Sequence, residues 1–335
     1  MAGIKVLIVD DSFFMRKVIS DILTSDPDIV VVGQASDGLE ALDRIGELHP
    51  DVVTLDIMMP KLSGFSALER IMAIERPPAV LMVSAYTKED AEITLNCLAM
   101  GAVDFVLKPS ESAAHELDKV ATELLAKVKV AAKVSPAHLA AATPGPLPHA
   151  KKYGIVVIGS STGGPVALEL LLPLLPKNLS CPVLVAQHLP AQFVNSLTDR
   201  LAKRCKLLVE TAVDGDKLSP GTIYFAPGGA NTEVVRSNTG QMMLSVTPST
   251  EILTPSVDKL MISAAKMYPG ATLGIILTGM GEDGLEGMKA IKEAGGHTIV
   301  QDEESSVVFG MGRTVAEHGL ADNLVPLGQI AEKIL

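Results

Sequence analysis

Aromatic residues and cysteine are scarce in this sequence. The 335 residues include no tryptophan, and aromatic residues make up only 3% of the chain. The three cysteines, Cys97, Cys181 and Cys205, are widely spaced and form no Cys-x-x-Cys pair. This pattern does not suit a disulfide framework, and we interpret the cysteines as reduced thiols in the core of a cytosolic protein.

An excess of positive charge and long apolar runs are also missing. The formal net charge of −11 argues against nucleic acid as the main partner, because that would need a basic stripe. No apolar run reaches the roughly 18–20 residues of a membrane helix, and the N-terminus lacks the layout of a signal peptide. We therefore expect a cytoplasmic protein without membrane insertion. At about 100–200 residues per domain, the length favours two domains.

The first half of the chain, residues 1–128, alternates strand-like and helix-like segments. This alternation predicts a parallel sheet covered by helices on both faces. The strand-like segments are 4–9, 29–34, 52–55, 79–83 and 103–107, and the helix-like segments are 12–24, 37–47, 63–74, 88–98 and 111–128.

Residues 129–152 are rich in alanine and proline, which favours an interdomain linker because proline breaks helices and removes backbone donors. A second alternating pattern over residues 153–335 predicts a doubly wound, mostly parallel α/β domain. Its strand-like segments are 154–158, 182–186, 207–210, 222–225, 273–277 and 298–301, and its helix-like segments are 164–173, 191–203, 257–267 and 284–294.

Polar side chains follow the strands of the first predicted sheet. Asp10 and Asp11 follow its first strand, Asp56 ends the third, and Ser84 and Lys108 end the fourth and fifth. The carboxyl ends of parallel strands meet at one edge of such a sheet, where ligands bind. Mg²⁺ would relieve the repulsion between the carboxylates, because it prefers oxygen ligands and needs few from the protein. A lysine and a hydroxyl beside these carboxylates suit a phosphoryl group bound to one of them. Taken alone, the first two aspartates are also explained as caps of the following helix.

The spacing of these residues resembles the receiver domain of two-component response regulators over about residues 3–125. The match comprises Asp10-Asp11, Asp56-Ile-Met-Met-Pro60, Gly64, Ser84-Ala85 and Lys108-Pro109. The resemblance implies a flavodoxin-like (βα)5 fold and a histidine kinase as phosphodonor. It also implies the roles of single residues: Asp56 as phosphoryl acceptor, Asp11, Asp56 and the Met58 carbonyl as Mg²⁺ ligands assisted by Asp10, Ser84 and Phe105 as switch residues, and Lys108 as a phosphoryl contact. The family often has tyrosine where this chain has Phe105.

A serine, a histidine and an aspartate follow strands of the second predicted sheet. The first strand runs into Gly159-Ser160-Ser161-Thr162-Gly163, which fits the G-x-S-x-G turn that presents a serine hydroxyl between a strand and a helix. His188 follows the next strand, and Asp283 follows a later one. A nucleophile, a base and an orienting carboxylate at one sheet edge predict a catalytic triad. The order Ser, His, Asp differs from that of α/β-hydrolases, so the motif does not carry that fold with it.

Two other interpretations of this turn stay open at the level of the residues. A glycine-rich turn after a strand also suits a phosphate-binding loop, although these glycines do not fit G-x-G-x-x-G and Gln187-His188 stands where an acidic ribose ligand is expected. Alternatively, the three polar residues only supply hydrogen bonds within their turns and have no catalytic role.

The second half resembles the catalytic domain of the chemotaxis protein-glutamate methylesterases over about residues 153–335. The matching segments are Ile158–Pro165, Gln187–Pro190, Asp214–Asp216, Ala226–Gly228, Pro255–Asp258 and Leu277–Gly284. The resemblance implies Ser161 as nucleophile, His188 as general base and Asp283 as its orienting partner. Thr162 and the Met280 backbone N–H would shape the site and the oxyanion hole.

The combined resemblance implies a phosphorylation-activated serine esterase. It would demethylate glutamate methyl esters on methyl-accepting chemotaxis receptors, deamidate specific glutamines there, and take its phosphoryl group from the chemotaxis histidine kinase. It would bind Mg²⁺ in the receiver and need no cofactor in the catalytic domain. Three departures from the family pattern, Asn231, Thr254 and Gly312, leave the triad intact; we expect the first two to line the cleft.

Two other classes of function remain as alternatives. The chain could be a receiver-regulated adaptor with a catalytically silent site, although the complete triad argues against this. A transcriptional regulator is disfavoured by the acidic charge and by the absence of a C-terminal helix-turn-helix pattern.

Overall fold

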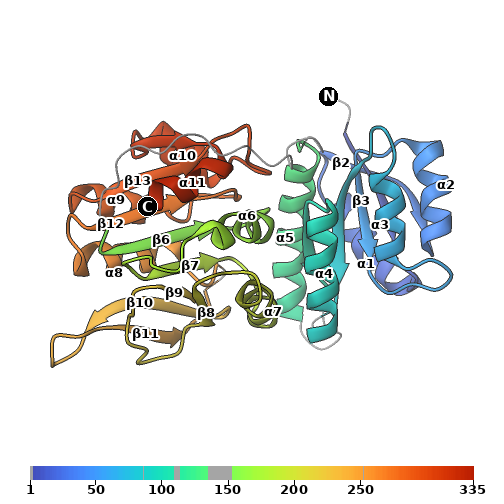
Figure 1. Ribbon diagram of the computed structural model, residues 1–335. Helices are drawn as coiled ribbons and strands as arrows, with labels where there is room; N and C mark the ends of the chain where they lie inside the picture. Colours follow the sequence, from blue (N-terminus) through green and yellow to red (C-terminus); the bar gives the residue numbers. More distant parts are fainter. Residues whose placement is uncertain (1–2, 86, 109–113, 135–152, 252) are drawn as a thin grey trace. The chain divides into compact units, whose positions relative to one another are not determined.

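The computed structural model divides into two compact units, Met1–Ala137 and His138–Leu335, which are described separately (Figure 1). The structure describes residues 3–85, 87–108, 114–134, 153–251 and 253–335. Most of the predicted linker, from residue 135 onward, therefore lies outside the described residues. Helix α5 (Ala114–Ala131) includes the first three residues of the segment that was predicted as linker.

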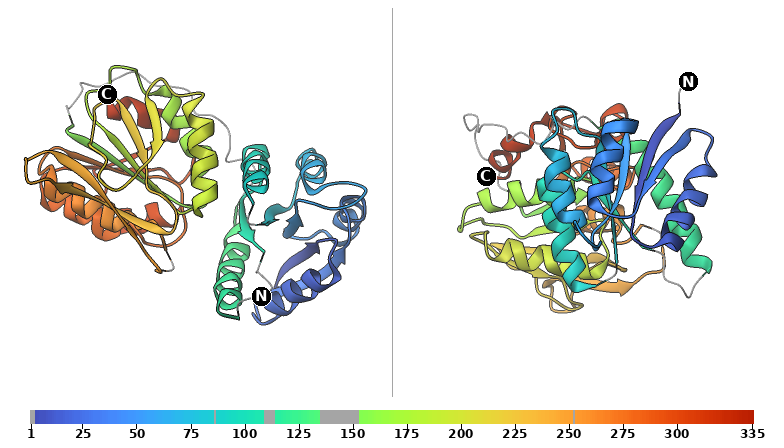
Figure 2. Two further views of the ribbon diagram at one scale, coloured as in Figure 1. Left: turned by 90° about the horizontal axis from the view of Figure 1, so that it is seen from below. Right: turned by 90° about the vertical axis from the view of Figure 1, so that its right-hand side faces the viewer.

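The first unit is a five-stranded sheet with the strand order β2-β1-β3-β4-β5, and every pair in it is parallel. Helices α1 and α5 pack together on one face, and α2, α3 and α4 cover the other (Figures 1 and 2). The predicted flavodoxin-like (βα)5 fold is confirmed. Its elements are β1 (Ile4–Val9), α1 (Phe13–Thr24), β2 (Ile29–Ala35), α2 (Gly38–Leu48), β3 (Val52–Asp56), α3 (Gly64–Met72), β4 (Ala79–Ser84), α4 (Lys88–Met100), β5 (Asp104–Leu107) and α5.

The second unit is built on a seven-stranded parallel sheet with the order β14-β13-β12-β6-β7-β9-β8. The predicted doubly wound, mostly parallel α/β architecture is confirmed. Its elements are β6 (Ile155–Ser160), α6 (Gly164–Leu171), the 3₁₀ turn η2 (Leu172–Leu174), β7 (Val183–Gln187), α7 (Ala191–Ala202), β8 (Leu208–Thr211), β9 (Thr222–Phe225), β10 (Ala230–Arg236), β11 (Met242–Pro248), α8 (Val257–Met267), β12 (Thr272–Ile276), α9 (Leu285–Glu293), β13 (His297–Gln301), α10 (Met311–Glu317), β14 (Asn323–Val325) and α11 (Leu327–Ile334).

The central strand β6 is buried along its whole length because both faces of the sheet are covered. Side chains alternate between the faces of a strand. Ile155 and Val157 accordingly belong to a core shared with α8, α9 and α10. The left view of Figure 2 shows α8 and α9 on one side of the sheet, and α6, α7 and α11 on the other. The near-continuous apolar runs of the sequence thus reflect strands buried on two sides.

An antiparallel hairpin, β10–β11, stands outside the main sheet and was not predicted from the sequence. It packs against α8, and the Val234 backbone N–H donates to the Ser263 hydroxyl on that helix at 2.9 Å. Val234 and Leu244, which pair across the hairpin, are both buried in the core beneath it. The hairpin therefore helps to fix the position of α8.

The order of the strands reverses direction at β6. From β6 the chain adds β7 on one side and, later, β12 on the other. Such a reversal separates the loops that leave adjacent strand ends and opens a binding crevice there. The loops after β6, β7 and β12 carry the three residues of the predicted triad.

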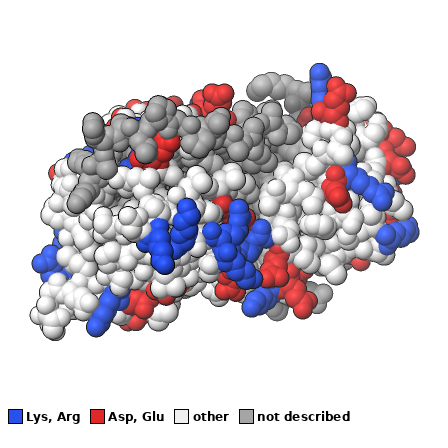
Figure 3. Space-filling view, in the orientation of Figure 1, with Lys and Arg blue, Asp and Glu red and all other residues white. Residues whose placement is uncertain are grey.

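Charged residues of both signs are mixed on the surface. Figure 3 shows basic and acidic side chains close together on the visible face of each unit. Arg44 and Glu47, for example, form an exposed pair at 3.2 Å. Within the described ranges, no helix is long and apolar enough to cross a bilayer.

Candidate active site and phosphorylation site

Ser161 lies on the turn between β6 and α6. Its backbone N–H donates to the Thr278 carbonyl at 3.1 Å, and Gly163 begins α6 with φ +77°. The loop after β12 passes so close that a Cβ on Gly279 would lie 2.9 Å from the Ser161 Cβ. The turn that carries Ser161 and the loop after β12 can therefore contact each other, because Gly163 adopts a positive φ and Gly279 has no side chain.

Gln187, the last residue of β7, holds this turn from the other side. Its side-chain carbonyl accepts from the Ser160 hydroxyl at 2.7 Å, and its amide donates to the Ser161 carbonyl at 2.9 Å. The glutamine is 1% exposed. This positioning role was missed in the sequence, where the signal was a polar residue at the end of a wholly apolar strand.

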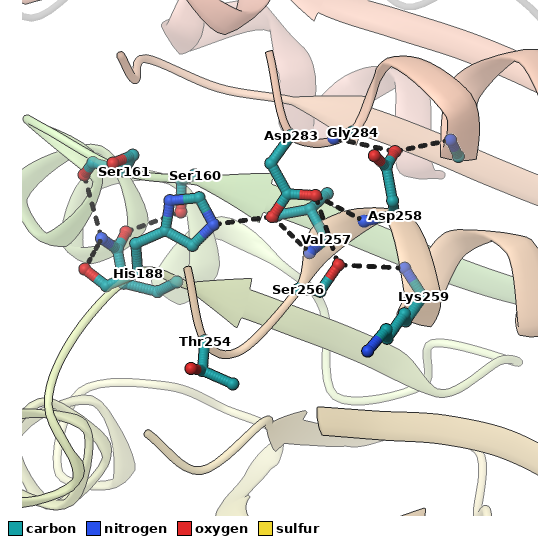
Figure 4. A network of polar contacts seen from close by, with 12 residues as sticks. Ser160, Ser161, His188, Thr254, Ser256, Val257, Asp258, Lys259, Asp283 and Gly284 are labelled. Atoms are coloured by element: carbon teal, nitrogen blue, oxygen red, sulfur yellow. Dashed lines mark hydrogen bonds and ion pairs between the residues drawn. The ribbon is translucent and has the colours of Figure 1, made fainter. Parts of the chain in front are cut away.

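His188 and Asp283 form a hydrogen-bonded pair. Nε2 of the imidazole lies 2.8 Å from Oδ2 of the carboxylate, and the side chains are 10% and 8% exposed. Figure 4 shows the imidazole between Ser161 and Asp283, with its second nitrogen on the serine side. Among the described residues there is no hydrogen bond between the Ser161 hydroxyl and this ring. Such contacts are often long before substrate binds.

The Asp283 carboxylate also accepts from the start of α8. The backbone N–H groups of Val257 and Asp258 donate to it at 2.8 and 2.9 Å, and the Ser256 hydroxyl donates at 3.3 Å. Burial alone would raise the pKa of the Asp283 carboxyl. The hydrogen bonds from His188 and from these N–H groups outweigh burial and hold the pKa below its usual value. The positive end of the helix dipole acts in the same direction.

The two residues predicted to shape the oxyanion hole lie on the loops that meet at Ser161. Thr162 is 4% exposed, and its backbone carbonyl accepts from the Thr278 hydroxyl at 2.9 Å. Met280 follows Gly279, where an added Cβ would lie 3.0 Å from the Ser161 backbone nitrogen. The backbone of both residues is therefore close to the serine.

Asn231 has a structural role at the start of α8. Its side-chain carbonyl accepts from the Ser256 N–H at 2.9 Å, and its amide donates to Glu251 at 3.0 Å. It is 6% exposed. Thr254 lies on the neighbouring loop beneath the imidazole in Figure 4. Gly312 lies in α10, where a Cβ would meet the Phe309 ring at 2.7 Å, so the glycine permits close packing.

In the first unit, Asp10, Asp56 and Lys108 meet at the sheet edge. The lysine Nζ lies 2.9 Å from Asp10 Oδ2 and 2.8 Å from Asp56 Oδ2. Oxygens of Asp10, Asp11 and Asp56 lie within 4.8 Å of one another. Burial raises the pKa of the Asp56 carboxyl to about 6, and Asp10 adds to the shift although Lys108 opposes it. This cluster of hard oxygen donors fits Mg²⁺.

Neither of the first two aspartates caps the first helix. The N-cap of α1 is Ser12, whose hydroxyl accepts from the Met15 N–H at 3.3 Å. Asp10 instead accepts from the Ser12 N–H at 2.9 Å and pairs with Lys108, while Asp11 is exposed. The capping interpretation was therefore wrong, and both carboxylates belong to the cluster at the sheet edge.

The two predicted switch residues contact residues outside the acidic cluster. The Ser84 hydroxyl lies 2.9 Å from the Thr94 hydroxyl on α4. Phe105 is 3% exposed, and the Lys127 ammonium lies 5.2 Å from its ring centroid. Met58, whose backbone carbonyl is the predicted ligand, is 64% exposed.

Comparison with known proteins found matches for both halves of the chain. Residues 156–334 match the family model described as CheB methylesterase, and residues 6–120 match the response regulator receiver domain. A protein-glutamate methylesterase/protein-glutamine glutaminase of Thermotoga maritima is 44% identical, with 99% of this chain and 98% of the relative covered. A Pyrococcus abyssi protein of the same name is 41% identical, with 99% and 93% covered. The crystal structure of the Thermotoga maritima CheB methylesterase catalytic domain is similar with a TM-score of 0.53 at 41% identity, covering 55% of this chain and 97% of that one.

Proposed function

The chain belongs to the CheB methylesterase family and carries a response regulator receiver domain, and on this basis we propose that it is a phosphorylation-activated protein-glutamate methylesterase that also deamidates glutamine. It would act in the cytoplasm, and its substrates would be methyl-accepting chemotaxis receptors. The observation that carries the catalytic part is the 2.8 Å His188–Asp283 pair beside the Ser161 turn. A serine, an imidazole and a carboxylate in this order perform acyl transfer.

In the proposed reaction, the Ser161 oxygen attacks the ester carbonyl of a methylated glutamate. His188 takes the serine proton, through the ring nitrogen that does not face Asp283, and passes it to the departing methoxide, which leaves as methanol. Water then attacks the acyl-enzyme by the same route and releases glutamate and Ser161. A glutamine side chain would react in the same way and release ammonia.

The negative charge that develops on the carbonyl oxygen needs donors near Ser161. The Met280 backbone N–H is the proposed donor, with Thr162 shaping the site. Their loops meet at the serine because Gly279 has no side chain. Fixed backbone donors of this kind are effective because they need no reorientation during the reaction.

In the receiver, Asp56 is the proposed phosphoryl acceptor, and the chemotaxis histidine kinase is the proposed donor. Asp10, Asp11, Asp56 and the Met58 carbonyl would hold Mg²⁺, which offsets charge on the phosphoryl oxygens when bound. Lys108 already contacts Asp56 and would contact the phosphoryl group. Ser84 would respond by exchanging its present contact with Thr94 for one toward Asp56, and Phe105 would be the second switch residue.

Methanol release from methylated receptor membranes tests this function. We expect release by the wild-type chain to rise with a small phosphodonor and Mg²⁺, and to vanish in Ser161→Ala. His297 offers a matched control for His188, because it also faces an aspartate, Asp322, at 3.0 Å but lies away from the serine turn. His188→Ala should abolish release while His297→Ala keeps it. Release that survives Ser161→Ala would refute the nucleophile assignment, and no release from wild type would favour the adaptor alternative.

A further inference from the structure

Helices α8 and α9 cap each other next to the proposed triad. Asp283 precedes α9, and its carboxylate accepts from the first N–H groups of α8, those of Val257 and Asp258. Asp258 lies in the first turn of α8, and its Oδ1 accepts from Gly284 at 2.9 Å and Gly287 at 2.7 Å, at the start of α9. Figure 4 shows the two carboxylates in this reciprocal arrangement.

We propose that Asp258 is a positioning residue for the esterase reaction: by capping α9, it fixes the place of Asp283 against both the imidazole and the start of α8. The proposal rests on the proposed triad, because it assigns Asp258 a role only through Asp283 and His188. Asp258 would touch neither the substrate nor the reacting atoms.

The start of α9 depends on an acceptor from elsewhere. Its N-cap is Gly284, at φ +105°, which has no side chain to accept from the first turn. The first N–H groups of a helix lack partners within the helix, and burying them unpaired is costly. Asp258 supplies the missing acceptor for two of them. Since Asp283 and Gly284 are adjacent, the same contact restrains the triad carboxylate.

Close packing of the two helices brings the Asp258 carboxylate into reach. A Cβ on Gly287 would lie 2.5 Å from the Met261 Cβ, so only glycine permits this approach. On the other side, a Cβ on Gly284 would lie 2.6 Å from Ile276 Cδ1 and 3.1 Å from Val257 Cγ1. The loop that carries Asp283 is thus held between β12 and α8, with Asp258 as its polar anchor.

The charges around Asp258 are consistent with a role through hydrogen bonds. Burial raises the pKa of the Asp258 carboxyl to about 6, and the negative charges of Asp283 and Glu286 add to the shift, while the N–H groups of Gly284 and Gly287 oppose it. Lys259, the next residue on α8, points to Glu251 at 2.7 Å instead. A neutral acceptor of the same shape should therefore serve in place of the carboxylate.

Three substitutions of Asp258 in the full-length chain separate these contributions. Asp258→Asn keeps an acceptor oxygen and removes the charge, Asp258→Glu keeps the charge and displaces the oxygen, and Asp258→Ala removes both. With receptor membranes, a small phosphodonor and Mg²⁺, we expect kcat to fall about 10- to 100-fold in the Ala and Glu variants, because small misplacements of catalytic groups have effects of this size. KM should change less than about threefold, and the Asn variant should retain kcat within about fivefold.

A spectroscopic signature and a matched control distinguish positioning from general destabilisation. The proton shared by His188 and Asp283 should give a downfield NMR signal in wild type and Asp258→Asn, which weakens or disappears in Asp258→Glu. Asp322→Ala is the control, because Asp322 accepts from the Thr298 N–H at 2.9 Å and pairs with His297, away from the serine turn. This control should lower thermal stability without changing kcat or the NMR signal.

The outcomes keep this inference separate from the proposed function. If Ser161→Ala and Asp283→Asn lose activity while folded Asp258→Glu keeps kcat within threefold, only the positioning role fails. An Asp258→Asn variant that is as impaired as Asp258→Glu would also overturn it, since the charge would then matter more than the hydrogen bonds. Activity that persists in Ser161→Ala would refute the triad itself.

Discussion

Replacing Asp283 by asparagine removes the most heavily hydrogen-bonded carboxylate of the proposed active site. Oδ2 accepts from His188 and Val257, and Oδ1 accepts from Asp258 and Ser256. An asparagine has one oxygen and one NH₂ group in these places. Whichever way the amide is turned, its NH₂ group faces a backbone N–H donor from the start of α8.

The orientation with the amide nitrogen toward Ser256 costs less, because the serine hydroxyl can reverse and accept. It still leaves the Asp258 N–H without a partner, at about 1–3 kcal/mol, and it makes two charge-assisted hydrogen bonds neutral, at about 1 kcal/mol in total. We therefore expect Asp283→Asn to lower the free energy of unfolding by about 2–4 kcal/mol. The loss of the orienting charge should lower kcat by about 10²- to 10⁴-fold.

Urea unfolding followed by circular dichroism, with hydrogen exchange at Val257 and Asp258, measures the stability effect. Asp322→Asn serves as the control because that carboxylate also contacts a histidine and a backbone N–H, at 3.0 and 2.9 Å. It should lose stability but keep activity. Were Asp283→Asn to unfold within 1 kcal/mol of wild type, with unchanged exchange at both amides, the hydrogen bonds to α8 would have no energetic weight and the reasoning would be wrong.

Three further predictions concern glycine packing, phosphorylation and pH. Gly64→Ala should destabilise the receiver by more than about 2 kcal/mol and slow phosphorylation, because the added Cβ would overlap the Asp56 carbonyl oxygen. Thermal unfolding measures the stability, and labelling with acetyl phosphate measures the phosphorylation. Wild-type values in both assays would show that the close approach of Gly64 to Asp56 has no effect. Asp56→Asn should remove the stimulation of methanol release by phosphodonor while leaving basal release intact; stimulation that persists would exclude Asp56 as the acceptor. Finally, the Asp258 pKa of about 6 exceeds its usual 3.8, so the folded chain binds this proton more tightly and loses stability as pH rises through that interval. The Asp258→Asn variant lacks this titration. The difference in unfolding free energy between variant and wild type should therefore shift in favour of the variant by about 1–2 kcal/mol from pH 4 to pH 7, allowing for solvent screening. Urea unfolding at both pH values measures the difference, and a difference that stays constant would contradict the prediction.

The parallel sheets were predictable because their strands are buried on both faces. In the sequence, such strands are short apolar runs separated by helical segments. β9 (Thr222–Phe225) and α8 (Val257–Met267) were even predicted with the bounds that the structure shows. One rule then placed Ser161, His188 and Asp283 together: the carboxyl ends of parallel strands meet at the same edge of a sheet. The rule needs only the order of elements, not their packing.

The hairpin and helix α10 were missed because their signals are weak, whereas helix α11 was missed although its signal is clear. β10 carries exposed charged residues such as Glu233 beside buried Val234, and its burial comes from α8, which lies later in the sequence. Helix α10 has seven residues and a glycine N-cap without a side-chain hydrogen bond. Helix α11 did carry a signal, because Ile330, Ala331 and Ile334 recur at helical spacing and are buried.

The contacts of Gln187, Asn231 and Asp258 could not be derived from hydrophobic patterns, for a different reason. Each acts by donating to or accepting from a backbone group more than twenty residues away, or by reaching a neighbouring helix. Such contacts depend on how close two elements approach, which is decided by packing at positions such as Gly287. Hydrophobic periodicity gives the elements but not these distances.

The two carboxylates at the centre of the two sites are stabilised by different partners, and the difference matches their proposed chemistry. Asp56 is paired with the Lys108 side chain, at 2.8 Å, whereas Asp283 accepts from backbone N–H groups of α8. A carboxylate that becomes covalently phosphorylated changes its shape and charge, so it needs a partner that can move with it, and a lysine side chain is flexible. A carboxylate that only orients an imidazole keeps its charge throughout the reaction and is served best by donors that do not move. In the proposed roles, an aspartate near the end of a parallel strand would be a phosphoryl acceptor in one unit and a fixed support in the other. The neighbouring elements differ accordingly, because they provide a flexible cation in the first case and a helix N-terminus in the second.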